Sequence, residues 1–356
     1  MSVTRHPDGP PDWWIYRGTG RPLQDVVLAE RLPSAPPWRT FTGGPLPELD
    51  VVPPDDGEAD RRLGMEHHLS ARHVDPHEVE MVNAALYLRR PLLVTGRPGS
   101  GKSTLAYRIS RELGLGRVLR WPITSLTTLK SGLYGYDAIG RAQAAGTRPA
   151  VSAAPSGEYQ EPPIGEFVRL GDLGTAFLPR RLPRVLLIDE LDKSDSDLPH
   201  DLLNLFEDGE FTIPELARSA RRSPLVEVFT ADPNGTAMLE GGRVACAAFP
   251  VVVITSNGER DFPPAFLRRC LRFETKDPDT EQLAAMVAAH AVDPDNQHRS
   301  RLIEEFVARS AALGGLPADK LLDAVYLATS GAYSEDGDSW PRLVDALWRQ
   351  LNSLVS

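Results

Sequence analysis

A glycine-rich loop that ends in lysine and serine carries the clearest chemistry in this sequence of 356 residues. Glycines let such a loop turn tightly and point successive backbone N–H groups inward, and a following helix adds the positive end of its dipole. Lys102 is placed to reach β- and γ-phosphates, and the Ser103 hydroxyl is placed to hold Mg²⁺. The loop therefore predicts binding of a nucleoside triphosphate with Mg²⁺. The predicted binding residues are Gly96, Arg97, Pro98, Gly99, Ser100, Gly101, Lys102, Ser103 and Thr104.

Two adjacent acids, Asp189 and Glu190, end a second apolar run at 184–188. Side chains alternate along a strand, so one acid can face a metal ion while the other faces the attacking water. We therefore predict that Asp189, with Ser103, is a Mg²⁺ partner. Glu190 is then the predicted base that polarises the nucleophile.

A third apolar run, at 250–255, brings an amide to the same predicted edge of the sheet. Ligands collect there in open α/β sheets, so Asn257 could bind the γ-phosphate or orient water; capping of a turn is the alternative. Beyond it, Arg268 and Arg269 are adjacent like charges, which are unfavourable unless an anion or acid is near. Either one could be an arginine finger that reaches the triphosphate of a neighbouring subunit.

The elements that must position these residues follow from apolar periodicity. Short apolar runs alternate with helical patterns, which is typical of a mainly parallel sheet covered on both faces. The sequence thus predicts an α/β fold, a three-layer P-loop NTPase core followed by a small all-helical lid. Strands are expected at 91–95, 118–123, 184–188, 250–255 and 271–274.

Composition sets the predicted domain boundaries. Eleven of the 32 prolines lie between Pro7 and Pro54, so residues 1–60 are expected to form an extended arm. The α/β core is expected over 61–277, with an insertion at about 134–167, and the lid over 278–356, where strand patterns stop.

Charge and cysteine content narrow the function classes. A net charge of −10 argues against a protein whose main role is to hold nucleic acid. Cys246 and Cys270 lack any C-x-x-C spacing, so we expect two buried reduced thiols. No apolar run approaches a membrane span and no signal peptide is evident, which favours a cytoplasmic location without membrane contact. The acids at 192, 195 and 197 are interpreted as decorating the start of a helix.

The phosphate loop, acid pair, amide and paired arginines form an ordered set that resembles the AAA+ ATPases. The stretches 189–194, 202–209 and 255–260 look like the MoxR branch, and the resemblance covers about residues 65–330. It implies ATP as the nucleotide. It also implies that Lys102 and Ser103 are Walker A residues, Asp189 and Glu190 the Walker B pair, Asn257 sensor 1, and Arg268 or Arg269 the trans-acting finger.

The resemblance further implies a ring, commonly a hexamer of identical subunits, with ATP at each subunit boundary. The insertion and a hairpin within 225–249 would touch a protein client, for which a von Willebrand A domain protein is one candidate. One departure is Lys320, which stands where a sensor 2 arginine is expected. A lysine cannot make the paired hydrogen bonds of a guanidinium group, so the sequence leaves open whether the lid senses the bound nucleotide.

The predicted function is ATP hydrolysis in a ring that remodels or activates a protein partner. A DNA-restriction motor subunit that uses GTP or ATP is one alternative, and the acidic net charge disfavours it. A nonhydrolytic nucleotide switch is another, which the intact acids at 189 and 190 argue against.

Overall fold

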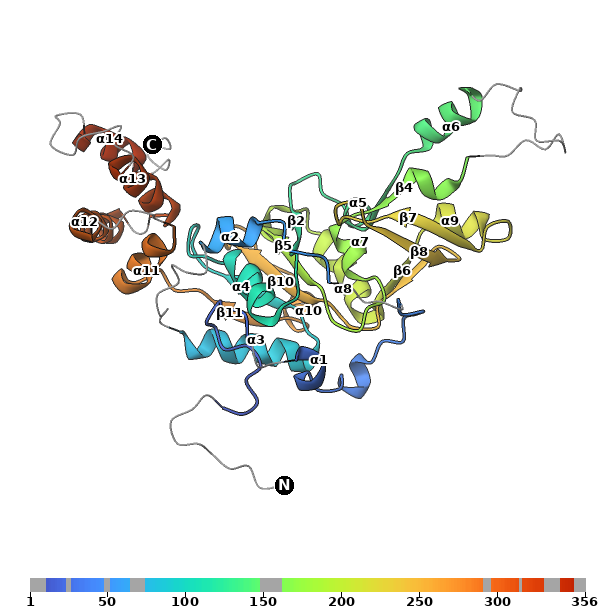
Figure 1. The fold of residues 1–356 in the computed structure, drawn as a ribbon, viewed down its shortest axis with the longest axis horizontal. Helices are drawn as coiled ribbons and strands as arrows, with labels where there is room; N and C mark the ends of the chain where they lie inside the picture. The colour runs from blue at the N-terminus through green and yellow to red at the C-terminus, as the bar shows by residue number, and fades with distance from the viewer. Residues whose placement is uncertain are drawn as a thin grey trace.

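Five parallel strands form the central sheet, in the order β11-β1-β10-β5-β2 (Figure 1). The computed structural model describes residues 11–23, 27–47, 52–64, 74–147, 162–290, 296–313, 316–329 and 340–348. Each of the five predicted apolar runs forms one strand of this sheet, so the predicted α/β fold is confirmed. The strands are β1 (Leu92–Thr95), β2 (Leu119–Pro122), β5 (Val185–Asp189), β10 (Val251–Ser256) and β11 (Leu271–Glu274).

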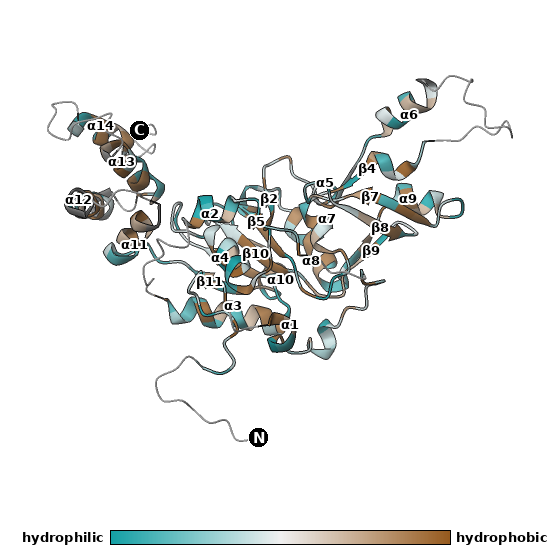
Figure 2. Cartoon of the chain, viewed as in Figure 1, coloured by the Kyte–Doolittle hydropathy of each residue, from teal (hydrophilic) through white to brown (hydrophobic). Residues whose placement is uncertain are grey.

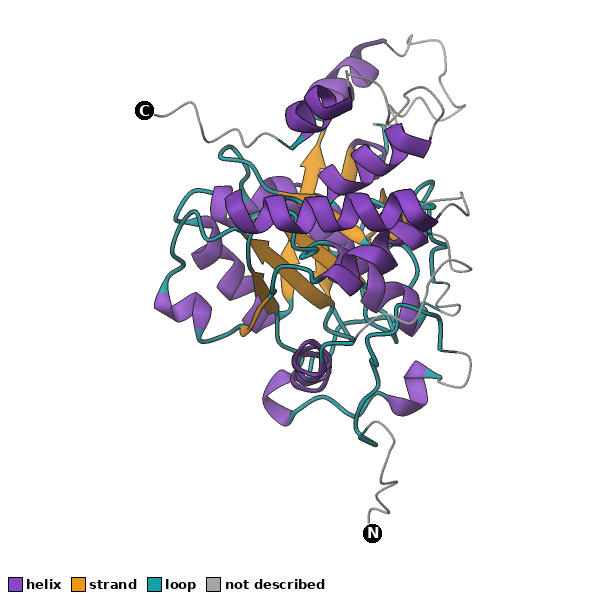
Figure 3. Ribbon diagram, turned by 90° about the vertical axis from the view of Figure 1, so that its left-hand side faces the viewer, coloured by secondary structure: helices purple, strands orange, loops and turns teal. Residues whose placement is uncertain are grey.

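Helices cover both faces of this sheet, which explains why its three inner strands, β1, β10 and β5, are almost entirely apolar and buried (Figures 2 and 3). Along β1, Leu92 and Val94 join the apolar cluster of one face, whereas Leu93 joins the cluster of the other. The first face packs on α3 (Pro76–Leu88) and α4 (Thr104–Leu113). The second packs on α7 (Asp172–Ala176), α8 (Leu198–Asp208) and α10 (Pro264–Leu267).

Local signals set the ends of the helices next to the site. The Asp75 carboxylate accepts the backbone N–H of His77 at 2.9 Å and so caps α3, with Pro76 in the first turn. Gly114 ends α4 in the left-handed conformation, with φ at 65°. These signals therefore fix where α3 begins and where α4 ends.

A second, four-stranded sheet has the order β3-β4-β7-β8 and lies at one end of the molecule, away from the lid (Figure 1). Its strands β7 and β8 form the hairpin expected within 225–249. Helix α6 leaves from β3 inside the expected insertion, whose residues 148–161 lie outside the described part of the chain. The elements here are β3 (Tyr134–Tyr136), α6 (Ala138–Thr147), η3 (Ile164–Phe167), β4 (Val168–Leu170), α9 (Pro214–Ser219), β7 (Leu225–Phe229) and β8 (Thr236–Glu240), beside the pair β6 (Glu210–Thr212) and β9 (Arg243–Ala245).

The proline-rich N-terminal segment packs on the core. Asn83 of α3 accepts the backbone N–H of Tyr16 at 3.0 Å and donates to its carbonyl at 2.7 Å. Glu112 of α4 accepts the backbone N–H of Gly20 at 2.9 Å. The segment is thus bonded to both helices of one face. It contains α1 (Leu28–Arg31), η1 (Pro37–Arg39) and α2 (Glu58–Leu63), and α2 packs against α4.

The C-terminal helices form a lid with its own apolar core, separate from the two clusters of the α/β part. Trp348 is buried there, with its ring 5.5 Å from that of Phe306 in an edge-to-face arrangement. Within the described residues, no helix is long and apolar enough to cross a bilayer. The lid helices are α11 (Thr280–His290), α12 (Asn296–Leu313), α13 (Asp319–Thr329) and α14 (Trp340–Leu347).

Candidate active site

The glycine-rich loop connects β1 to α4, as the sequence predicts. Its glycines at 96, 99 and 101 all have positive φ, at 147°, 78° and 81°, which a residue with a Cβ rarely adopts. Lys102 is buried, and its ammonium donates to the carbonyls of Gly96 at 2.8 Å and Arg97 at 2.6 Å. Burial lowers the pKa of Lys102, while the charges of three nearby acids oppose that shift. The backbone of the loop thus surrounds the ammonium group of its own Lys102.

The remaining loop residues tie the loop to the end of β11 and to the segment that leads to the lid. The hydroxyls of Ser100 and Thr275 share a hydrogen bond of 2.6 Å. Arg97 forms an ion pair of 3.0 Å with Asp277. The exposed members of the loop are Arg97, Pro98 and Gly99, and Thr104 opens α4.

Asp189 ends β5 beside the loop and accepts hydrogen bonds at both carboxylate oxygens. Its Oδ1 accepts from Ser103 Oγ at 2.7 Å and from Thr255 Oγ1 at 2.8 Å. Its Oδ2 accepts from Arg120 Nη2 at 2.8 Å and Nε at 3.1 Å. Burial alone would raise the pKa of Asp189, but these hydrogen bonds outweigh burial and lower it. The carboxylate is therefore held in its charged form.

Ser103 and Asp189 provide oxygen donors of the kind that Mg²⁺ prefers. The hydroxyl and the carboxylate are already within 2.7 Å of each other, at the start of α4 and the end of β5. The residues present therefore fit the metal that the loop motif implies.

Glu190 turns the chain away from β5 in the left-handed conformation, with φ at 64° and ψ at 50°. Such a conformation is strained for a residue with a Cβ, and strained backbone positions cluster at functional sites. Its backbone N–H donates to Thr255 Oγ1 at 2.8 Å. Its carboxylate accepts from Lys193 Nζ at 2.7 Å and lies 3.5 Å from Asn257 Nδ2. The structure thus brings together Glu190 and Asn257, from the ends of two neighbouring strands.

Asp192 holds the loop that carries Asn257. It lies in η4 (Leu191–Lys193) and is buried, with 3% of its surface exposed. Its Oδ2 accepts the backbone N–H of Asn257 at 2.8 Å and of Glu259 at 3.1 Å. Its Oδ1 is buried without a partner among the described residues. The interpretation of Asp192 as helix-surface decoration is therefore wrong.

Arg268 and Arg269 lie at the opposite end of the sheet from the loop. They precede β11, whose register sets Leu271 beside Leu92 at the start of β1. The glycine-rich loop follows Thr95, at the other end of that strand. Neither arginine therefore belongs to the cluster around Asp189 in the same chain.

The two arginines differ in their partners. Arg269 Nε donates to Glu207 Oε1 at 2.8 Å, and Glu207 Oε2 lies 3.7 Å from Arg39 Nη1. Arg268 is exposed, and its side chain has no hydrogen-bond or ion-pair partner in the described ranges. Arg269 is thus paired with an acid that it shares with Arg39, whereas Arg268 has no acid partner among the described residues.

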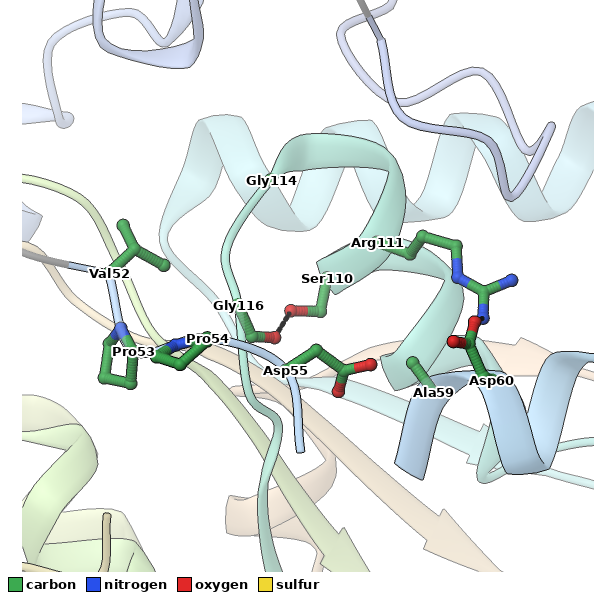
Figure 4. A pocket seen from close by; sticks show the side chains of 10 residues that line it. All are labelled: Val52, Pro53, Pro54, Asp55, Ala59, Asp60, Ser110, Arg111, Gly114 and Gly116. Atoms are coloured by element: carbon green, nitrogen blue, oxygen red, sulfur yellow. Dashed lines mark hydrogen bonds and ion pairs between the residues drawn. The ribbon is translucent and has the colours of Figure 1, made fainter. Parts of the chain in front are cut away.

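A cavity of about 590 Å³ lies beside the loop. The arm contributes Thr19 and Gly20 to its wall, α2 contributes Leu63, and the lid contributes Met286. A separate cavity of about 540 Å³ lies near the other end of α4, between Asp55 and Gly116 (Figure 4). It contains no residue of the glycine-rich loop, so only the first cavity adjoins the predicted phosphate site.

The match to a known family agrees with this geometry. The family described as AAA domain (dynein-related subfamily) matches residues 91–270, half of the 356 residues. The chain belongs to this AAA family. Membership implies nucleotide binding and nucleotide-dependent ATPase activity. No curated protein matches the chain.

Three residues of this AAA site escaped the sequence analysis: Arg120, Asp192 and Thr255. Arg120 carried a signal, because it is a charge on an otherwise apolar run next in the sheet to the run that ends in Asp189. Thr255 and Asp192 lie within predicted motifs, but their roles depend on hydrogen bonds between segments about 65 residues apart.

Proposed function

We propose that this AAA protein is a MoxR-type ATPase that hydrolyses ATP with Mg²⁺ at the subunit boundaries of a ring. The energy of turnover would remodel or activate a protein partner. The observation that carries the proposal is the convergence of a phosphate loop, two acids and an amide on the carboxyl ends of β1, β5 and β10, which are neighbours in the sheet.

Each residue has a role that its geometry supports. Lys102 would exchange its two loop carbonyls for phosphate oxygens, since a buried ammonium gains more from an anion than from a carbonyl. Ser103 and Asp189 would hold Mg²⁺, which neutralises charge on the phosphates when bound. Glu190 would orient the attacking water with the help of Asn257, which lies 3.5 Å away.

The cavity beside the loop suits the nucleoside part of the ligand. It joins the arm, the core and the lid, so an occupant contacts all three. Binding of the nucleotide would therefore favour one placement of the lid over others.

The direct test replaces Glu190 by glutamine, which keeps the size and shape of the side chain and removes its charge. We expect ATP affinity within about twofold of wild type and turnover lowered by about 100-fold or more, as for loss of a general base. Isothermal titration and phosphate release measure the two quantities. Unchanged turnover would remove Glu190 from this role, and no ATP hydrolysis by wild type at any protein concentration would favour the nonhydrolytic switch.

The choice between the two arginines favours Arg268 as the trans-acting finger. Both lie too far along the sheet to serve their own site, so either must act on a neighbouring subunit. Both side chains are exposed, but Arg269 is already paired with Glu207 within the chain, whereas Arg268 has no acid partner in the described residues. A finger must offer an uncompensated charge to the transition state.

Matched alanine variants test that choice. We expect Arg268→Ala to lower turnover by about 1,000-fold or more, as for other arginine fingers, and Arg269→Ala to lower it less than about 10-fold. Wild-type turnover per subunit should rise steeply with protein concentration. The reverse order of the two variants would assign the finger to Arg269, and flat activity per subunit would argue against shared sites.

The lid offers Lys320 as the residue that senses the phosphates. It lies at the start of α13, three residues after Pro317. A Cβ built on Gly99 of the phosphate loop would collide with the Cα of Pro317. The segment just before α13 therefore lies against the loop, which supports a role for Lys320 near the phosphates.

The second sheet is the surface that we propose for the client. Leu225, Phe229 and Met238 are exposed on the β7–β8 hairpin, and Ile139 is exposed on α6. Exposed apolar side chains of this kind are found where proteins bind one another. A von Willebrand A domain partner and a hexameric ring are parts of the same proposal. Turnover that required GTP and DNA would instead support a restriction motor.

A further inference from the structure

A guanidinium occupies one oxygen of the acid assigned to Mg²⁺. Arg120 donates two hydrogen bonds to Oδ2 of Asp189, and Ser103 and Thr255 donate to Oδ1. The chain itself thus supplies hydrogen bonds to both carboxylate oxygens.

The position of Arg120 would allow its side chain to leave this contact. It lies on β2, an edge strand of the sheet, where it pairs with Leu187, two residues before Asp189. The Arg120 side chain is 41% exposed, whereas the Asp189 side chain is 8% exposed. Asp189 is its only ion-pair partner within the described residues. A long side chain with access to solvent can swing away while the buried acid stays in place.

Mg²⁺ and Arg120 would compete for the same carboxylate. Both are cations, so the presence of one at Asp189 raises the free energy of the other there. A triphosphate changes this balance because it brings several negative charges to the loop, and guanidinium binds phosphate oxygens well. Displacement of Arg120 is therefore easiest when nucleotide and metal arrive together.

We propose that Arg120 is an internal counter-ion of Asp189, a positioning residue that holds the acid in the nucleotide-free site and gives way to Mg²⁺ when the nucleotide binds. The inference rests on the proposed function, because it takes Asp189 as the Mg²⁺ partner. Its consequence is that the empty site resists free Mg²⁺, so that metal capture depends on the nucleotide.

The first test measures how strongly Mg²⁺ supports nucleotide binding. A fluorescent, non-hydrolysable ATP analogue is titrated onto wild type and Arg120→Ala, once with Mg²⁺ and once with EDTA. The ratio of the Kd in EDTA to the Kd in Mg²⁺ should be about 3- to 10-fold larger in the variant, because Mg²⁺ no longer has to break an arginine–carboxylate pair. Arg120→Gln, which keeps a hydrogen-bond donor without charge, should show the same direction. Arg218→Ala, at an exposed position on α9, should leave the ratio unchanged.

The second test needs no nucleotide. Mn²⁺ binding, followed by electron paramagnetic resonance, should be at least about threefold tighter in Arg120→Ala and Arg120→Gln than in wild type. Equal Mn²⁺ affinity together with an unchanged ratio in the first test would overturn the exchange and leave the proposed function standing. Failure of wild type to bind the analogue in either buffer would remove the proposed function, and this inference with it.

Discussion

The two ends of strand β5 both carry ion pairs, and the pairs are built differently. At the amino end, Arg184 donates from Nη1 and Nη2 to the two oxygens of Asp232, at 2.7 and 2.8 Å. Both side chains are buried, with 3% and 7% exposed. At the carboxyl end, Arg120 binds only one oxygen of Asp189 and is 41% exposed.

The difference teaches which ion pair belongs to the fold and which to the function. The pair of Arg184 and Asp232 is closed, because both charges are buried and each depends on the other for its stabilisation. The pair at Asp189 is open on one side, so another cation can take the place of the guanidinium. Strand β5 thus has a buried ion pair at its amino end and, at its carboxyl end, an ion pair whose guanidinium another cation could replace.

The largest expected effect comes from the closed end. Asp232→Ala leaves the Arg184 guanidinium buried without its carboxylate, and we expect a loss of about 3–5 kcal/mol in the free energy of unfolding. Urea denaturation measures it. Glu210→Ala, which breaks the exposed ion pair of Glu210 with Arg243, is the control and should cost less than about 1 kcal/mol. A similar small loss in both variants would contradict the distinction between closed and open pairs.

The same pair predicts how acid acts on stability. Burial raises the pKa of Asp232, but the hydrogen bonds and charge of Arg184 outweigh burial and lower it below 3.8. A lowered pKa gives stability that is present above pH 3.8 and is lost as the pH falls through the folded-state pKa. The difference between wild type and Asp232→Ala should therefore shrink below that pH.

The next largest effect is expected at Lys102, in the phosphate loop at the same edge of the sheet as the open pair. Lys102→Ala should weaken ATP binding by about 100-fold or more, since charge-assisted hydrogen bonds to phosphate are lost. Thermal stability should not fall, because burial disfavours the charged form of Lys102. Fluorescence titration and a melting curve measure the two effects. Lys130→Ala, at an exposed position on α5 (Leu129–Leu133), is the control, and an affinity loss of equal size there would contradict the prediction.

The smallest effect is expected at Asp192. Like the closed pair it is buried, but like the open pair it binds residues of the site. Asp192→Ala removes the acceptor of the Asn257 and Glu259 N–H groups, so turnover should fall about 10-fold with little change in ATP affinity. Asp192→Asn keeps one acceptor oxygen and should restore most of the turnover. The control is Asp195→Ala, in the same acidic run but exposed. Equal effects at Asp192 and Asp195 would contradict a specific role of Asp192 in holding the loop that carries Asn257.

The sequence predicted the parts of the molecule that depend on short-range signals. The three inner strands of the main sheet are nearly continuous apolar runs because both faces are covered, and such runs are visible without knowledge of the partners. The phosphate loop was equally local, since its residues lie within a few positions of one another. The interpretation of Cys246 and Cys270 as buried thiols is confirmed, and burial raises the pKa of each to about 12.

The features that the sequence could not predict depend on register between distant segments. Strands β3, β4, β6 and β9 have three residues each, too few to show periodicity. Arg120 reaches Asp189 only because β2 lies beside β5 in a particular register. The choice between Arg268 and Arg269 needed the position of Glu207 on α8, about 60 residues away in the chain.

The close approach of Gly99 and Pro317 makes the phosphate loop and the lid mechanical neighbours. A side chain at position 99 would collide with the main chain before α13, so the two backbones are in direct contact. A change in the loop conformation would therefore reach the start of α13 through direct backbone contact. Transmission of nucleotide status to the lid would thus need no long side chain spanning the gap, which makes an arginine at the start of that helix dispensable.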